Sequence, residues 1–267
     1  MKPVVTLAWL LLMWSAPAAA GDTAACVIGK GLYEGWLGLA KAGSVHAGGG
    51  VPVAGAPTDI PAPDRRKAIG KEYQSFFRCL SDSKDEEAVQ AQCKDVEGDR
   101  VAQLACHTAA YLKGGRMKAK EFLDSLPANR KGAEAIWDLY AIADSGDAPP
   151  VFQPGGPAHK LIDELFLLML DDRETAAAKY MMAATLATGD AARHIDEQML
   201  MLLRESPSVL VKRWMVFRQY QPKFKKLVAE LSANPVELQK VRKGIGAFCG
   251  KDNPDCPEIV RLFGKSE

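Results

Sequence analysis

Basic and aromatic side chains alternate in one stretch near the C-terminal end of the chain. Between Glu205 and Glu230 there is no acidic residue. Positive charge beside aromatic rings is how proteins hold polyanions or stack on sugar and base rings. The candidate contact residues of this stretch are Arg213, Trp214, Arg218, Tyr220 and Lys225. Trp214 and Phe217 are three residues apart, however, which favours a structural interpretation with the rings in the core and the cations on the solvated side.

Histidine, the residue most often used in acid-base catalysis, occurs without a catalytic or zinc-binding motif around it. The four histidines are His46, His107, His159 and His194. A His-Glu-x-x-His pair is missing, so the zinc-peptidase pattern is excluded. His159 and His194 stand near the starts of two similar stretches, where a surface or capping role is the simpler expectation. Catalysis would need an acid brought close by the fold, for instance beside His107.

Two further patterns invite a catalytic interpretation but fit a structural one better. Ser81 and Lys84 have the spacing of the serine and lysine of penicillin-binding enzymes, but the companion Ser-Asp-Asn and Lys-Thr-Gly motifs are missing. Acids such as Asp163-Glu164 are neighbours in sequence rather than a pair facing each other across a cleft. We therefore assign no catalytic residue and favour a protein that is not an enzyme.

Motifs for a cofactor or a metal are also missing. The sequence has no Cys-x-x-Cys pair, which argues against a thioredoxin-type centre, a zinc ribbon and haem attachment. The phosphate-binding glycine-rich loop and the Gly-x-Ser-x-Gly motif do not occur. Gly244 and Gly246 lie in a helical stretch and follow no strand, so they form no dinucleotide-binding turn. We expect no cofactor and no metal site.

The first twenty residues have the layout of a secretory signal peptide. Lys2 precedes an apolar run over residues 4–14, and small residues lead to an expected cut after Ala20. This pattern predicts export to the periplasm or the exterior of a bacterial cell, without a transmembrane anchor in the mature chain. A lipid on Cys26 is the less favoured alternative, because Thr23-Ala24-Ala25 lacks the usual large aliphatic residue.

All six cysteines lie beyond the expected cut, and an even number in an exported chain indicates disulfides. Cys249 and Cys256 enclose a loop that contains Gly250, Asn253 and Pro254, so a local bridge there is easy to form. The other four cysteines leave three pairings open: Cys26, Cys79, Cys93 and Cys106.

Charge gives no hint of nucleic-acid or membrane binding. Without Lys2, 33 basic side chains face 33 acidic ones, so the chain has no long-range attraction to a polyanion. We expect a partner that is another protein or an envelope component, and no nucleic acid.

The pattern of apolar residues is helical along most of the chain. Residues 67–80, 85–93, 101–112, 119–126 and 132–143 each carry apolar side chains at helical spacing. Two stretches rich in glycine and proline, 43–64 and 144–157, are expected to be irregular, the first as a linker and the second as a surface loop. No stretch alternates like a strand, so we predict an all-α fold.

One helical unit occurs more than once in the sequence of the second half. Residues 162–183 placed over 195–216, an offset of 33, are identical at seven of 22 positions, including the triplet Ile-Asp-Glu. A shorter third copy follows at an offset of 28, where Leu227, Val228 and Leu231 match Met199, Leu200 and Leu203. Each unit reads as two helices with a polar break between them.

Helix pairs that recur every 30–45 residues or so are typical of α-solenoids, in which each pair buries its apolar face on the next. Residues 158–248 resemble HEAT-like helical-repeat proteins in their paired helices, their polar or proline-containing internal turn and the Gly-Asp between pairs. The resemblance implies antiparallel helix pairs stacked as a short α-solenoid. The alternative is an irregular helical bundle, also disulfide-bonded.

These predictions combine into one domain plan and one functional hypothesis. The plan is a signal peptide (1–20), an N-terminal segment with linker (21–64), a cysteine-containing helical region (65–143), a loop (144–157), a helical-repeat region (158–249) and a C-terminal tail (250–267). The hypothesis is an exported binding or scaffold protein that uses the surface of its repeats. The alternative is a cell-envelope hydrolase whose active site is assembled only by the fold.

Overall fold

The computed structural model describes residues 26–45, 62–143, 157–171, 173–250 and 253–264. Within these ranges every regular element is a helix, which confirms the all-α prediction. The expected signal peptide and most of the two irregular stretches lie outside the described residues.

The first half of the chain forms six α-helices and one short 3-10 helix in the described residues. They are α1 (Leu32–Val45), α2 (Ala62–Asp82), α3 (Glu86–Gln92), α4 (Arg100–Gly114), η1 (Arg116–Lys118), α5 (Ala119–Ser125) and α6 (Arg130–Ala143). The linker prediction was wrong at both edges, because residues 43–45 end α1 and residues 62–64 begin α2. Tyr33 and Trp36 of α1 are buried: the Tyr33 hydroxyl donates to Asp138 of α6 at 3.1 Å, and the Arg66 guanidinium of α2 lies 4.6 Å from the centre of the Trp36 ring. This packing keeps α1 helical up to the glycine-rich stretch.

The second half begins with α7 (Pro157–Leu170), α8 (Glu174–Ala184), α9 (Gly189–Glu205), α10 (Pro207–Lys212) and α11 (Trp214–Phe217). It ends with η3 (Arg218–Tyr220), α12 (Gln221–Leu231), α13 (Pro235–Phe248) and α14 (Cys256–Phe263). Helix α14 lies in the segment assigned as a tail. It is ordered by the core, in which Ile259 and Phe263 are buried.

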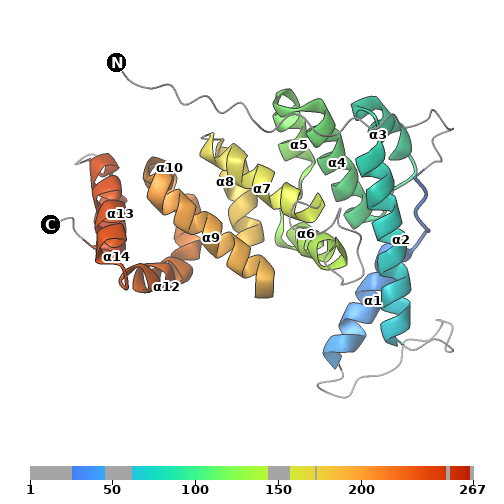
Figure 1. Ribbon diagram of the computed structural model, residues 1–267, viewed down its shortest axis with the longest axis horizontal. Helices are drawn as coiled ribbons and strands as arrows, with labels where there is room; N and C mark the ends of the chain where they lie inside the picture. Colours follow the sequence, from blue (N-terminus) through green and yellow to red (C-terminus); the bar gives the residue numbers. More distant parts are fainter. Residues whose placement is uncertain (1–25, 46–61, 144–156, 172, 251–252, 265–267) are drawn as a thin grey trace.

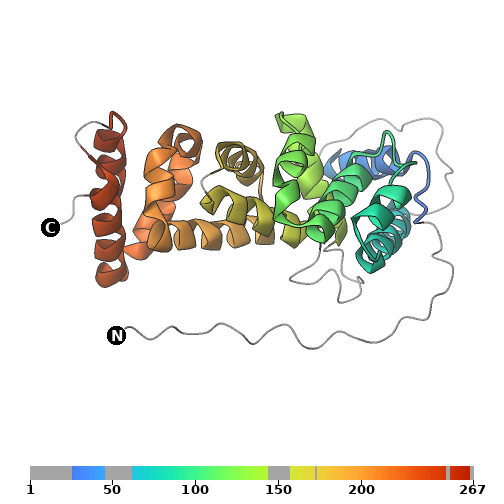
Figure 2. The same cartoon turned by 90° about the horizontal axis from the view of Figure 1, so that it is seen from above.

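The helices follow one another along the long axis of the molecule, from α1, α2 and α3 at one end to α13 and α14 at the other (Figures 1 and 2). Helix α7 packs most extensively on α8, α9 packs on α10, and α13 contacts both α9 and α10. One continuous hydrophobic core runs through the stack from Cys26 to Phe263. The all-α body is therefore extended in one direction, and its identity as a HEAT-like solenoid stays a prediction.

Local sequence signals start several of these helices. The Asp85 and Asp99 carboxylates accept hydrogen bonds of 2.9 Å from the backbone N–H groups of Ala88 and Ala102, which are otherwise unpaired donors of the first turn. Pro207 and Pro235 occupy the first turn of α10 and α13. Proline is tolerated there because a backbone N–H at that position would have no partner within the helix. The polar breaks that separate the predicted helices thus act as helix starts.

Three disulfides join the cysteines in the described part of the chain. Cys249 pairs with Cys256 as predicted, and their Cα atoms are 5.3 Å apart. Of the three open pairings for the remaining four, the structure selects Cys26–Cys79 and Cys93–Cys106, with Cα–Cα distances of 5.6 and 6.0 Å. The first ties the segment before α1 to α2, and the second ties the end of α3 to α4. Both therefore strengthen the region that precedes the repeats.

Candidate functional site

The three residues of the repeated Ile-Asp-Glu triplet have different surroundings. Ile162 and Ile195 are buried in the core at equivalent places on α7 and α9. Asp163 accepts hydrogen bonds from two side chains of α9, and Asp196 accepts one from η3. Glu164 accepts one of 3.2 Å from the Tyr111 hydroxyl of α4, on the preceding side. The triplet therefore supplies both core packing and the contacts between successive units.

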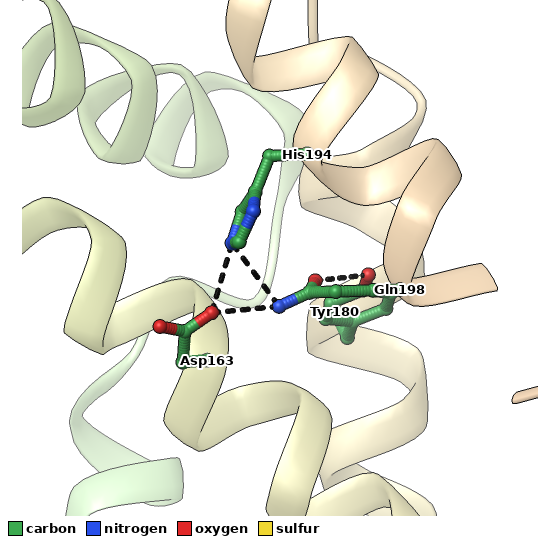
Figure 3. Close-up of polar contacts among 4 residues, drawn as sticks. All are labelled: Asp163, Tyr180, His194 and Gln198. Atoms are coloured by element: carbon green, nitrogen blue, oxygen red, sulfur yellow. Dashed lines mark hydrogen bonds and ion pairs between the residues drawn. The ribbon is translucent and has the colours of Figure 1, made fainter. Parts of the chain in front are cut away.

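Asp163 lies at the first of these joints, together with residues from two neighbouring helices (Figure 3). Its Oδ1 accepts hydrogen bonds from His194 Nε2 at 2.8 Å and from Gln198 Nε2 at 2.7 Å. The Tyr180 hydroxyl donates to Gln198 Oε1 at 2.6 Å. These bonds connect α7, α8 and α9. When His194 Nε2 donates its proton to Asp163 it cannot also accept one, so its 3.2 Å approach to Gln198 Nε2 is a contact between two donors.

His194 is the titratable group of this joint. The hydrogen bond to Asp163 raises the pKa of His194, and this effect exceeds the opposing effect of partial burial. The ring of His159 lies edge to face against His194, with centroids 5.3 Å apart. His159 in turn lies 4.7 Å from the Tyr140 ring of α6. His159 of α7 and His194 of α9 thus face each other at this joint.

Asp196 lies at the second joint, one repeat further along. The Tyr220 hydroxyl donates to its Oδ1 at 2.8 Å, and the ammonium groups of Lys223 and Lys226 lie 3.7 and 3.9 Å from its carboxylate. Lys226 corresponds to Gln198 at the offset of 28 that defines the third copy. One pair of corresponding positions, Gln198 and Lys226, therefore lies beside the corresponding aspartates at two successive joints.

Two ion pairs connect further helices of the second half. Arg213, at the break between α10 and α11, lies 3.3 Å from Glu174 at the start of α8. Arg204 of α9 lies 3.1 Å from Glu237 of α13. These pairs are partly or fully solvated, so each contributes at most about 1 kcal/mol. Their main effect is to favour one relative orientation of the helices that they connect.

The predicted basic-aromatic contact residues separate into buried and exposed groups. Trp214 is fully buried and Tyr220 is 2 % exposed, with its hydroxyl on Asp196. Arg213 pairs with Glu174, and Arg218 pairs with Glu258 of α14 at 3.1 Å. Lys225 is exposed. The rings therefore follow the structural interpretation. Of the three basic residues, only Lys225 has no ion pair within the described residues.

A pocket of about 580 Å³ lies in the cysteine-containing region, between α3, α4 and α5. Its apolar wall consists of Val89, Val96, Ala110, Tyr111, Phe122 and the Cys93–Cys106 disulfide. Its polar wall consists of Glu86, Gln90, Lys94, Glu97, Gln103, His107, Lys118, Glu121 and Ser125. A smaller pocket of about 220 Å³ shares Gln103, His107 and Ser125 with it and continues towards Arg100 and Asn129.

His107 lies where the two pockets meet. Partial burial lowers the pKa of His107. The neutral form of the ring is therefore favoured near pH 7. Two carboxylates of this pocket, Glu86 and Glu121, lie 3.6 and 3.3 Å from the ammonium of Lys118 and share it. In the described chain no hydrogen bond joins His107 to a carboxylate. The hydrolase alternative, which needs such a pair, stays a prediction.

The remaining candidates of the sequence lie in structural positions. Ser81 lies in the last turn of α2, and its carbonyl accepts a 3.0 Å hydrogen bond from Lys113. Asp171 pairs with Arg116 at 2.7 Å. His46 is outside the described residues. Among the residues that the structure describes, no cluster of metal-binding side chains occurs and no helix is long and apolar enough to cross a membrane.

Sequence reasoning missed the role of Asp163 and Asp196, because it treated such acids only as neighbours in sequence. The signal was present, because both copies of the repeat keep the aspartate at the same position. The pocket had no such signal, since its walls come from three segments that only the fold brings together. Comparison with known proteins gives no further guide: no family model, no curated protein and no solved structure matches the chain.

Proposed function

We propose that the protein is an exported, non-enzymatic binding or scaffold protein whose C-terminal helix pairs form a short HEAT-like stack. In this proposal the outer surface of the stack holds another protein or an envelope component. Three disulfides support export, because such bonds persist in oxidising compartments.

The observation that carries the proposal is the repeated contact of Asp163 and Asp196 with the helices that follow them. Contacts of this kind join units in series rather than around a common centre. A series of units exposes one side of each to solvent, so the accessible surface grows with every unit. Extended surfaces of this type suit a large partner better than a small substrate.

Exposed apolar side chains recur on the same part of the chain. Leu167 on α7, Met201 on α9 and Met215 on α11 are 39, 51 and 67 % exposed. Methionine is flexible and polarisable, which suits contact with a protein surface. Lys225 on α12 adds an exposed positive charge. A partner with apolar groups and a negative charge would match these exposed side chains.

Site-specific photo-crosslinking tests the proposal. A benzophenone amino acid replaces Met201 or Met215, and Met117, which is 94 % exposed on η1, serves as the matched control. The proteins are incubated with envelope extract of the source organism and irradiated. We expect one adduct of defined mass from the first two positions, none from the control, and a weaker adduct after Lys225→Glu.

The charge reversal has its own control in Lys131→Glu on α6, which should leave the adduct unchanged. Adducts of equal yield from all three positions, or none from Met201 and Met215 in the folded protein, would contradict the proposal.

A further inference from the structure

The two pockets around His107 form one groove with a defined direction. Arg100, Gln103, His107 and Tyr111 are spaced along one side of α4, and each of them lines one or both pockets. Arg100 and Tyr111 are eleven residues apart, which corresponds to about 16 Å along the helix axis. Helix α5 runs beside the groove, with Glu121 at one end and Ser125 towards the other.

The ends of the groove differ in charge. Arg100 is exposed at the end lined by Asn129, and its guanidinium makes no ion pair in the described chain. The other end carries the carboxylates of Glu86 and Glu121, which share the ammonium of Lys118, and Glu86 also accepts a 2.8 Å hydrogen bond from Gln90. A ligand with a carboxylate at one end and an amine at the other is complementary to this arrangement.

The middle of the groove offers hydrogen bonds of both kinds. A neutral His107 has one donor and one acceptor, and the Gln103 amide has both as well. The Ser125 hydroxyl is already used, because it donates to the carbonyl of Phe122 at 2.6 Å. Donor and acceptor groups in a row match the alternating N–H and C=O groups of an extended peptide. The apolar wall, which includes Val96 and Phe122, can receive an apolar side chain.

We propose that this groove binds a short peptide with free ends, with its terminal carboxylate on Arg100 and its amine towards Glu86 and Glu121. An extended peptide covers about 3.3 Å per residue. A span of about 16 Å therefore corresponds to about five residues. The assignment is independent of the surface of the C-terminal stack, so either can hold without the other.

The probes are two pools of random-sequence pentapeptides, one with free C-termini and one with amidated C-termini. Binding to the oxidised full-length protein is followed by changes in its amide NMR spectrum. We expect the free-acid pool to bind and to shift the resonances of Gln103 and His107 most. The amidated pool should bind at least about tenfold more weakly, since it lacks the charge-assisted bond to Arg100.

Arg100→Gln should weaken binding of the free-acid pool about tenfold and abolish the preference for it over the amidated pool. Arg78→Gln is the matched control, because Arg78 is an exposed arginine on α2 outside the groove. His107→Phe tests the position of the ligand independently, since the larger ring fills the junction of the pockets. It should abolish binding while the spectrum stays that of the folded protein.

Three results would overturn the proposal. They are no binding of either pool at millimolar concentration, equal binding of both pools that Arg100→Gln leaves unchanged, and resonance shifts centred away from α4.

Discussion

Gln198 occupies the most constrained polar position in the C-terminal half. Its side chain is buried, and the two ends of its amide are used in different directions. The nitrogen donates to Asp163 and the oxygen accepts from Tyr180. A buried amide with both ends satisfied fixes the relative position of its neighbours, because any shift leaves a polar group unpaired.

Replacing the Gln198 amide should lower the free energy of unfolding markedly. Gln198→Leu leaves the buried Tyr180 hydroxyl without its acceptor, so we expect a loss of about 1–3 kcal/mol in the free energy of unfolding. Gln219→Leu on η3 is the control, since Gln219 is exposed and should change the value by less than about 0.5 kcal/mol. Urea denaturation of the three proteins measures the difference. Equal losses for both variants would contradict the role given to Gln198.

His194 should make the same joint dependent on pH. Its pKa in the folded protein is raised by Asp163 above the value of about 6.5 in the unfolded chain. A raised pKa stabilises the fold when both states are protonated, below about pH 6.5. That contribution is lost as the pH rises through the raised value of the folded state.

We therefore expect His194→Gln to lower the free energy of unfolding more at pH 5.5 than at pH 8.5.

His107 should have the opposite effect on stability, because partial burial lowers its pKa in the folded protein. Its contribution to the free energy of unfolding is present above about pH 6.5 and is lost as the pH falls through the lowered pKa. His107→Gln should accordingly reduce the destabilisation of the wild type at low pH. Denaturation curves at the two pH values measure both effects. A His194→Gln penalty that is the same at both pH values would show that this hydrogen bond does not act through the charged ring.

At the scale of elements, the helices are held in place differently at the two ends of the chain. Helices α2, α3 and α4 are linked by disulfides to one another or to the segment before α1. Helices α7 to α12 have no disulfide and depend on core packing and on the two aspartate joints. The last disulfide closes only the short loop between α13 and α14.

Removal of the disulfides should therefore affect stability in a definite order. Closing a longer loop restricts the unfolded chain more, and the separations are 53, 13 and 7 residues. The chain-entropy relation gives losses of about 4, 3 and 2.5 kcal/mol when alanine replaces each pair in turn, from Cys26–Cys79 to Cys249–Cys256. Guanidinium denaturation of the three variants tests the order. The reverse order would contradict the assigned pairing or its entropic effect.

Most individual helices were readable from the sequence, because their apolar spacing and capping residues are local. The break between α10 and α11 was not, since no proline or glycine marks it. It falls at Arg213, whose side chain reaches Glu174 on another helix. Helix α1 was not predicted either. Burial of Trp36 against α2 stabilises it, although its sequence contains glycines. Tertiary contacts decided both features.

At the scale of the whole molecule, the order of helices along the long axis follows their order in the sequence (Figure 1). The repeat predicted this succession only in the second half, where the Ile-Asp-Glu triplet recurs. It did not predict which residues touch across a joint, since this depends on how far each helix is rotated. The groove beside His107 was unpredictable from local pattern, because residues 86–97 and 118–125 meet α4 only in the fold.

Serial joining is the central claim, and native-state hydrogen exchange on Asp196→Asn tests it most directly. The substitution removes the charge that attracts Lys223 and Lys226 at the second joint and weakens the acceptor for Tyr220. In a stack in which units contact mainly their neighbours, the opening should be confined to the helices beyond that joint. We expect faster exchange in α12, α13 and α14 with unchanged protection in α2 to α6. A uniform loss of protection over all helices would contradict serial joining.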